Sequence, residues 1–195
     1  AGSSGGGSSA APSDGGSGGA DDLVDGRPRA AQVSHPACEV RPIAAAVASA
    51  MAGNGIDVIF KDAIEVVKKD SWTYRLMRRS EELVERSSSW NDLAVSAGRE
   101  LTSLDYYWAD LAPEAVSLTF VAFLGGEGDF EKTVLNAVNL GRDADTIAAM
   151  AGGIVGAMSG IHGIPKQWLP AVAEAPGVCL QATAGMNPMT VADEL

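Results

Sequence analysis

Two carboxylates and a hydroxyl, those of Asp143, Asp145 and Thr146, lie within four residues of one another. They precede an apolar, glycine-rich run, so they stand where a buried helix is expected to begin. Removing a carboxylate from water costs free energy unless something compensates its charge. A hard divalent cation held by oxygen ligands is a natural compensation. The cluster is therefore the place where chemistry is expected.

Residues two apart on a regular helix point to nearly opposite sides. Both carboxylates can reach one ion only if Asp143 lies in the turn after Gly141 and Asp145 occupies the first helical positions. Thr146 could then add its hydroxyl. The positive end of the helix dipole repels a cation, so the pattern predicts further acidic ligands from elsewhere. Spacing alone favours a simpler alternative, in which Asp and Thr cap free N–H groups without a metal.

The run that follows the cluster carries Gly152, Gly156 and Gly160 at intervals of four residues. A glycine inside a helix costs about 1 kcal/mol relative to alanine. Three glycines in register therefore predict a flat helix face that another helix backbone approaches closely.

Apolar residues recur at helical rather than strand spacing through most of the chain, which predicts an all-α, compact multi-helix fold. Proline and glutamate before an apolar run, and a Gly-Gly pair after it, mark one clear helix. The expected helices span 42–52, 56–69, 71–86, 91–101, 113–124, 129–140, 145–159 and 165–172, with 104–109 as a loop or short helix.

Composition divides the chain into three parts. Residues 1–32 open on a run of Gly, Ser and Ala and are predicted to be a flexible linker. Residues 33–175 are predicted to form the helical domain, and 176–195 a C-terminal tail.

Charge and cysteine usage exclude several classes of protein. The formal net charge of −11 argues against a nucleic-acid surface, which needs a basic face. The basic stretch from Arg75 to Arg79 is followed at once by glutamates, which predicts a solvated face of mixed charge. Cys38 and Cys179 lie far apart, which indicates a reducing compartment and a cytoplasmic protein. The apolar run 147–161 is shorter than the roughly twenty residues of a membrane span.

Several segments together resemble the C-terminal signature of the ADP-ribosylglycohydrolase family, whose relatives include the dinitrogenase-reductase-activating glycohydrolases. The resemblance covers about residues 33–172. It is carried by Phe130 to Thr146 (FEKTVLNAVNLGRDADT), Ala151 to Ala157 (AGGIVGA), Gly160, Ile164-Pro165-x-x-Trp168, Ser34-His35-Pro36 and Pro113-Glu114-Ala115-Val116.

The resemblance implies an all-α orthogonal bundle around a binuclear Mg²⁺ or Mn²⁺ site. The implied reaction is hydrolysis of the bond between ADP-ribose and an acceptor, such as an arginine or serine side chain. The substrate would be an ADP-ribosylated protein or a small molecule that contains ADP-ribose. Asp143 and Asp145 would bind metal through their carboxylates and Thr146 through its hydroxyl. Gly141 and Arg142 would contact substrate, and His35 would lie near its phosphates.

The chain departs from the family pattern in two ways. Arg142 stands where the family usually has glycine or asparagine, and it could reach a diphosphate, pair with Asp143 or point outward. The family's Gly-Asp-x-x-Gly helix and Thr-Asp-Asp-Thr motif, which supply the other metal ligands, are not in this chain. The chain therefore resembles the C-terminal half of such an enzyme, competent only with a complementary N-terminal half. A non-catalytic helical binding or structural module is the alternative.

Overall fold

The computed structural model describes residues 23–24, 27–28, 41–106, 108–178 and 180–194. The chain divides into two units, Ala1–Gln32 and Val33–Leu195. In the first unit, strands β1 (Leu23–Val24) and β2 (Arg27–Pro28) pair in antiparallel fashion. The predicted boundary between linker and helical domain, and that of the tail, stay predictions.

The second unit is helical among its described residues, which confirms the all-α prediction. Its α-helices are α2 (Arg41–Met51), α3 (Ile56–Glu65), α4 (Trp72–Arg86), α5 (Trp90–Glu100), α6 (Ala112–Gly126), α7 (Phe130–Asn139), α8 (Ala144–Ser159) and α9 (Pro188–Glu194). Three short 3₁₀ helices follow α8, namely η1 (Ile161–Gly163), η2 (Leu169–Val172) and η3 (Gln181–Thr183).

Two expected helices differ from the prediction: the helix expected over 56–69 ends at Glu65, and the helix expected over 165–172 is not an α-helix. The helix expected over 165–172 is reduced to the 3₁₀ turn η2, in which Pro170 is the second residue. Proline lacks an N–H and its ring clashes with the carbonyl four residues earlier, so an α-helix cannot run through this position undisturbed. The segment 104–109 forms turns and bends in its described residues, which selects the loop from the two alternatives.

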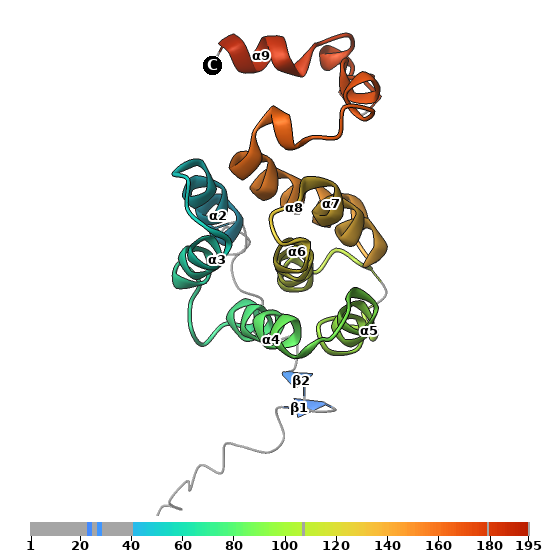
Figure 1. The fold of residues 1–195 in the computed structure, drawn as a ribbon. Helices are drawn as coiled ribbons and strands as arrows, with labels where there is room; N and C mark the ends of the chain where they lie inside the picture. Colours follow the sequence, from blue (N-terminus) through green and yellow to red (C-terminus); the bar gives the residue numbers. More distant parts are fainter. Residues whose placement is uncertain (1–22, 25–26, 29–40, 107, 179, 195) are drawn as a thin grey trace, which may run out of the picture. The chain divides into compact units, whose positions relative to one another are not determined.

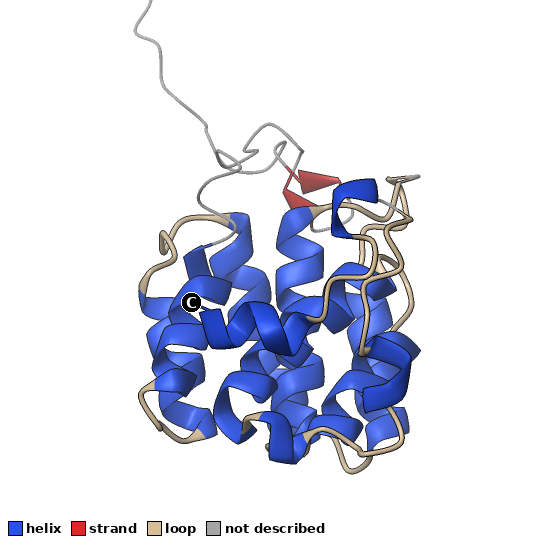
Figure 2. Ribbon diagram, turned by 90° about the horizontal axis from the view of Figure 1, so that it is seen from above, coloured by secondary structure: helices blue, strands red, loops and turns tan. Residues whose placement is uncertain are grey.

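Helix α6 lies at the centre of the bundle, with α2, α3, α4, α5, α7 and α8 around it (Figure 1). Twelve of its fifteen residues are buried. Its sequence is apolar on every side, and a helix of this kind is stable only when it is surrounded. It packs against α4, α5, α7 and α8. Figure 2 shows the same helices from above, joined mostly by short loops.

Two apolar clusters fill the space around α6. One joins α2, α3 and α8 to Phe120 and Phe123, and the rings of Phe60 and Phe120 meet edge to face with centroids 5.4 Å apart. The other joins α4, α5, α7 and α8 to α6 and contains Leu118 and Ile147. The helix that begins at the carboxylate cluster, α8, therefore contributes to both parts of the core.

The three glycines that the sequence places in register pack differently from the prediction. A Cβ built on Gly152 or Gly156 would lie 3.4 Å from Val134 or 3.5 Å from Phe130, which are ordinary contacts with α7 side chains. Gly160 follows α8 with φ of 60° and has nothing within 4 Å of that position. The predicted approach of a helix backbone along these glycines was therefore wrong.

Among the helices that the structure describes, none combines the length and the hydropathy that a bilayer crossing requires.

Candidate functional site

A tight turn between α7 and α8 presents the carboxylate cluster. Helix α7 ends at Asn139, and the next two residues beyond its C-cap, Gly141 and Arg142, have φ of 71° and 59°. Left-handed backbone is easy for glycine and uncommon for other residues except Asn, Asp and His. This geometry explains why glycine or asparagine suits the position of Arg142. The turn reverses the chain, so α8 runs back along α7.

Asp143 occupies the N-cap position of α8, but its carboxylate makes no capping hydrogen bond. Three other helices of the chain show what capping looks like. The N-cap side chains of Ser71, Ser89 and Asp129 each accept a hydrogen bond from the backbone N–H three residues later. Capping therefore does not account for Asp143, although spacing alone favoured it.

The candidate ligands project from the start of α8. Asp143 is half-buried, whereas Asp145 and Thr146 are exposed. None of the three side chains forms a hydrogen bond or an ion pair with the part of the chain that the structure describes. Unengaged carboxylate and hydroxyl oxygens are the donors that Mg²⁺ and Mn²⁺ prefer, so this donor set fits such an ion.

Of the predicted site residues, Gly141, Arg142 and Asp143 lie in the turn between α7 and α8, and Asp145 and Thr146 lie in the first turn of α8. Within the described ranges, no three His, Cys, Asp or Glu side chains gather in a way that could hold a metal ion. His35 lies outside the described residues, so its predicted place near the substrate phosphates stays a prediction.

Arg142 pairs with Glu114, a partner that the sequence did not suggest. Its Nε donates to Glu114 Oε1, and its Nη2 lies 3.4 Å from Glu114 Oε2 and 3.4 Å from the carbonyl oxygen of Ser103. The backbone N–H of Ser103 donates to Glu114 Oε2 at 2.8 Å. The hydrogen bond to Glu114 raises the pKa of the Arg142 guanidinium, against the opposing effect of burial.

Glu114 is the functional candidate that sequence reasoning missed. Its side chain is 1% exposed, and that of Arg142 is 19% exposed. Its position in the first turn of an otherwise apolar helix could have indicated this role. From the sequence alone, the same glutamate marks only the start of the helix. A buried carboxylate needs a cation nearby, and Arg142 lies 28 positions further along the chain.

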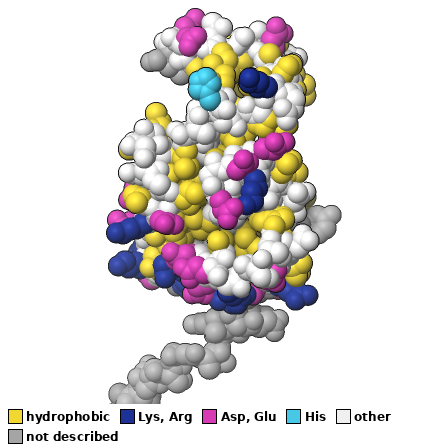
Figure 3. All heavy atoms as spheres, viewed as in Figure 1, with side chains coloured by type: hydrophobic (Ala, Val, Ile, Leu, Met, Phe, Trp, Pro, Cys, Tyr) yellow, Lys and Arg dark blue, Asp and Glu magenta, His cyan; other side chains and the backbone are white. Residues whose placement is uncertain are grey.

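The loop beside this network exposes large apolar side chains. Ser103 belongs to the loop between α5 and α6, in which Leu104, Tyr106 and Trp108 are 71%, 40% and 64% exposed. Apolar side chains also lie among acidic and basic ones on the face drawn in Figure 3. Exposed aromatic rings offer stacking surfaces for a nucleotide base, as well as contact area for another protein surface.

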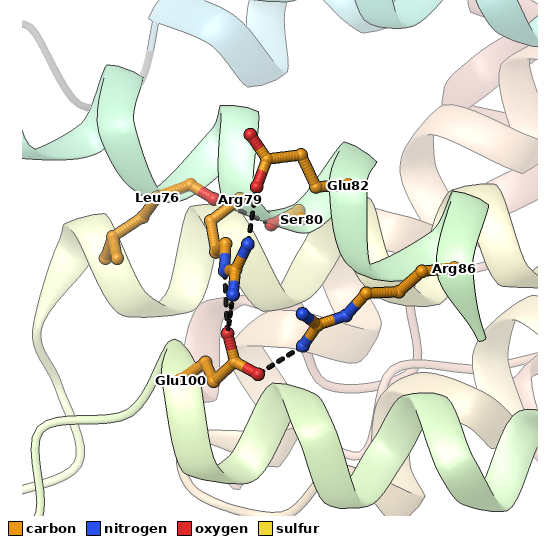
Figure 4. A network of polar contacts seen from close by, with 6 residues as sticks. All are labelled: Leu76, Arg79, Ser80, Glu82, Arg86 and Glu100. Carbon is orange, nitrogen blue, oxygen red and sulfur yellow. Dashed lines mark hydrogen bonds and ion pairs between the residues drawn. The ribbon is translucent and has the colours of Figure 1, made fainter.

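The densest group of charges ties helix α5 to α4. Arg79 Nε donates to Glu100 Oε2 at 2.6 Å, and Arg86 donates to the other oxygen of the same carboxylate (Figure 4). Arg79 also donates to Glu82 at 2.5 Å. Within the predicted stretch, Arg78 pairs with Glu81 and Arg79 with Glu82, so this face carries mixed charge as predicted.

Comparisons with known proteins agree on one family. The sequence model described as ADP-ribosylglycohydrolase matches residues 17–194. An uncharacterized protein from Archaeoglobus fulgidus is 31% identical over an alignment of 144 residues that covers 71% of this chain and 43% of that protein. No solved structure matches.

Two curated proteins with assigned names share shorter stretches. The ADP-ribosylarginine hydrolase Tri1 of Pseudomonas putida is 44% identical over 45 residues, 23% of this chain and 12% of that protein. The ADP-ribosylhydrolase ARH3 of Danio rerio is 51% identical over 41 residues, 21% of this chain and 11% of that protein. The chain thus spans less than half the length of the curated relatives it matches.

Proposed function

The chain belongs to the ADP-ribosylglycohydrolase family, and on that premise we propose that it supplies one side of a metal-dependent hydrolase site. The site would release ADP-ribose from a modified acceptor. The names of two relatives, an ADP-ribosylarginine hydrolase and an ADP-ribosylhydrolase, support this class of substrate.

The single observation that carries the proposal is that the Asp143 carboxylate, at the N-cap of α8, makes no hydrogen bond or ion pair with the described residues. The N-cap side chains of Ser71, Ser89 and Asp129 satisfy helix N–H groups, whereas this one leaves its oxygens available. Asp143 and Asp145 would hold Mg²⁺ or Mn²⁺ through their carboxylates, and Thr146 would add its hydroxyl. A bound divalent cation supplies Lewis acidity to substrate oxygens and lowers the pKa of a bound water.

The fold contributes the position of these groups. The left-handed turn at Gly141 and Arg142 sets the direction in which Asp143 leaves the backbone. Ile147, the first fully buried residue of α8, anchors the same turn in the core, and its N–H donates to the Asp143 carbonyl at 3.0 Å. The carboxylates therefore stand on a rigid element, as a preorganised site requires.

We place the remaining ligands and the general base on a complementary segment. A two-metal site holds its ions from several sides, and this sequence contains neither the Thr-Asp-Asp-Thr motif nor the Gly-Asp-x-x-Gly helix of the family. The archaeal relative, of which the match covers 43%, is long enough to include such a segment. An acidic group there would activate the attacking water.

The test is release of ADP-ribose from ADP-ribosylated arginine and serine peptides. The chain alone should be inactive, and an added N-terminal half with a Thr-Asp-Asp-Thr motif should give Mg²⁺- or Mn²⁺-dependent release. Asp143→Asn with Asp145→Asn should abolish that release. Asp193→Asn, on the exposed helix α9, is the matched control and should leave it unchanged.

Three results would contradict parts of the proposal. Turnover by the chain alone would show that acids within it, such as Asp105, Asp110 or Glu127, complete the site. Release that survives the double asparagine variant would remove Asp143 and Asp145 from the site. Binding of ADP-ribose without release in the mixture would favour the non-catalytic module.

A further inference from the structure

The buried Glu114–Arg142 pair joins three segments at the carboxylate turn. Glu114 lies in the first turn of α6, Arg142 in the turn between α7 and α8, and Ser103 in the loop after α5. Glu114 accepts hydrogen bonds from the other two, and Arg142 also reaches the Ser103 carbonyl. The residue that follows Arg142 is the candidate ligand Asp143.

Arg142 needs such a partner for two reasons. Its φ of 59° is a conformation that a long side chain does not favour, so surrounding contacts must hold it there. Arg142 also directly precedes Asp143 in the chain, and an unpaired guanidinium binds carboxylates through a planar fork. A guanidinium free to turn toward Asp143 would compete with a cation for the same oxygens.

We infer that Glu114 is a positioning residue for the cation site. It holds the guanidinium of Arg142 away from Asp143 and Asp145 and fixes the left-handed turn that presents them. This inference rests on the proposed function, since it concerns the same carboxylates.

The test uses the ¹⁵N-labelled full chain and Mn²⁺, whose paramagnetism broadens the amide signals of nearby residues such as Asp145 and Thr146. Glu114→Gln should weaken Mn²⁺ binding by about tenfold or more, as changes in the groups that orient metal ligands do. Adding Arg142→Gly to Glu114→Gln should restore the affinity to within about threefold of the parent, because it removes the competing cation and suits the left-handed backbone.

A matched control breaks a different ion pair between helices. Glu100→Gln disrupts the contacts of Glu100 with Arg79 and Arg86, between α4 and α5. It should lower the thermal midpoint without changing Mn²⁺ affinity. If Glu114→Gln does not fold, Arg142→Lys takes its place and should weaken binding likewise, because lysine keeps the charge and lacks the planar fork.

The inference is overturned if Glu114→Gln binds Mn²⁺ as the parent does, or if the double variant stays as weak as the single one. A parent chain without broadening would contradict the proposed metal site instead. The inference is then decided by spectra without metal. Glu114→Gln should shift the signals of residues 143–147, and the double variant should return them toward the parent. Unshifted signals in the single variant would overturn it.

Discussion

Gly126 and Thr133 approach each other so closely that no other residue fits at position 126. A Cβ on Gly126 would lie 1.9 Å from Thr133 Oγ1 and 2.9 Å from Thr133 Cα. The second of these atoms belongs to the backbone of α7, so a rotamer change cannot relieve the clash. Gly126→Ala should therefore force α6 and α7 apart, with a loss of about 2 kcal/mol in the free energy of unfolding.

Gly156→Ala is the matched control for this variant. Its Cβ would meet Phe130 at an ordinary 3.5 Å, and alanine favours a helix interior by about 1 kcal/mol over glycine. Urea unfolding should show stability equal to or above that of the parent. Equal effects of the two substitutions would contradict the assignment of close packing to Gly126.

The two aspartates at N-cap positions should differ in their effect on stability. Asp129 Oδ1 accepts a hydrogen bond from the backbone N–H of Lys132 at 2.7 Å, so Asp129→Ala should cost about 1 kcal/mol. Asp143 makes no such bond, and Asp143→Ala should cost less than about half as much. Chemical denaturation in metal-free buffer measures both. Equal losses would mean that Asp143 caps α8 in solution and that its carboxylate is engaged.

The link between α4 and α5 should weaken in acid. Burial raises the pKa of Glu100, but hydrogen bonds from Arg79 and Arg86 outweigh that effect and hold the pKa below its ordinary value. A pKa that is lower in the folded state gives stability that is fully present above the unfolded value, about 4.3, and is lost as the pH falls through the folded value.

The parent should therefore exceed Glu100→Gln in unfolding free energy by about 1 kcal/mol at pH 7. The difference should shrink when the pH is lowered below about 4. Urea unfolding at pH 7, 5 and 3 measures the difference at each pH. A difference that stays constant over this range would show that the ionised carboxylate of Glu100 does not contribute.

Cation binding by the chain alone should be weak, because the proposal assigns it only part of a ligand set. Titration calorimetry with Mn²⁺ should give a dissociation constant near millimolar, or about −4 kcal/mol. Asp143→Asn with Asp145→Asn should remove the heat of binding, as should a chelator. Micromolar affinity that survives both substitutions would place the cation elsewhere.

The positions of most helices could be predicted from the sequence, because apolar spacing and turn residues determine helices over a few neighbouring positions. The prediction of α6 is the clearest case, since Pro113 and the Gly125-Gly126 pair lie at its two ends. The turn at Gly141 and the start of α8 could likewise be predicted from the sequence. The predicted ligand roles of Asp143, Asp145 and Thr146 stay predictions.

What the sequence could not provide depends on contacts between distant segments. Glu114 and Arg142 are 28 positions apart, so no short motif predicts that their side chains pair. The same holds for Gly126, whose tight contact is set by the way α7 crosses it. The lack of a capping bond at Asp143 accompanies a ψ of 60°, which differs from the extended backbone of the capping residues Ser71, Ser89 and Asp129. Composition does not reveal this difference.

The position of α8 in the core has a consequence for synthesis on the ribosome. Ala46 and Ala50 of α2 belong to the same apolar cluster as Ile154 and Val155 of α8. At about 5–20 residues per second, the roughly 100 residues between these partners take about 5–20 s to emerge. During that interval α2 has an apolar face without its partner, so the nascent chain is vulnerable to proteases and aggregation until α8 has left the exit tunnel.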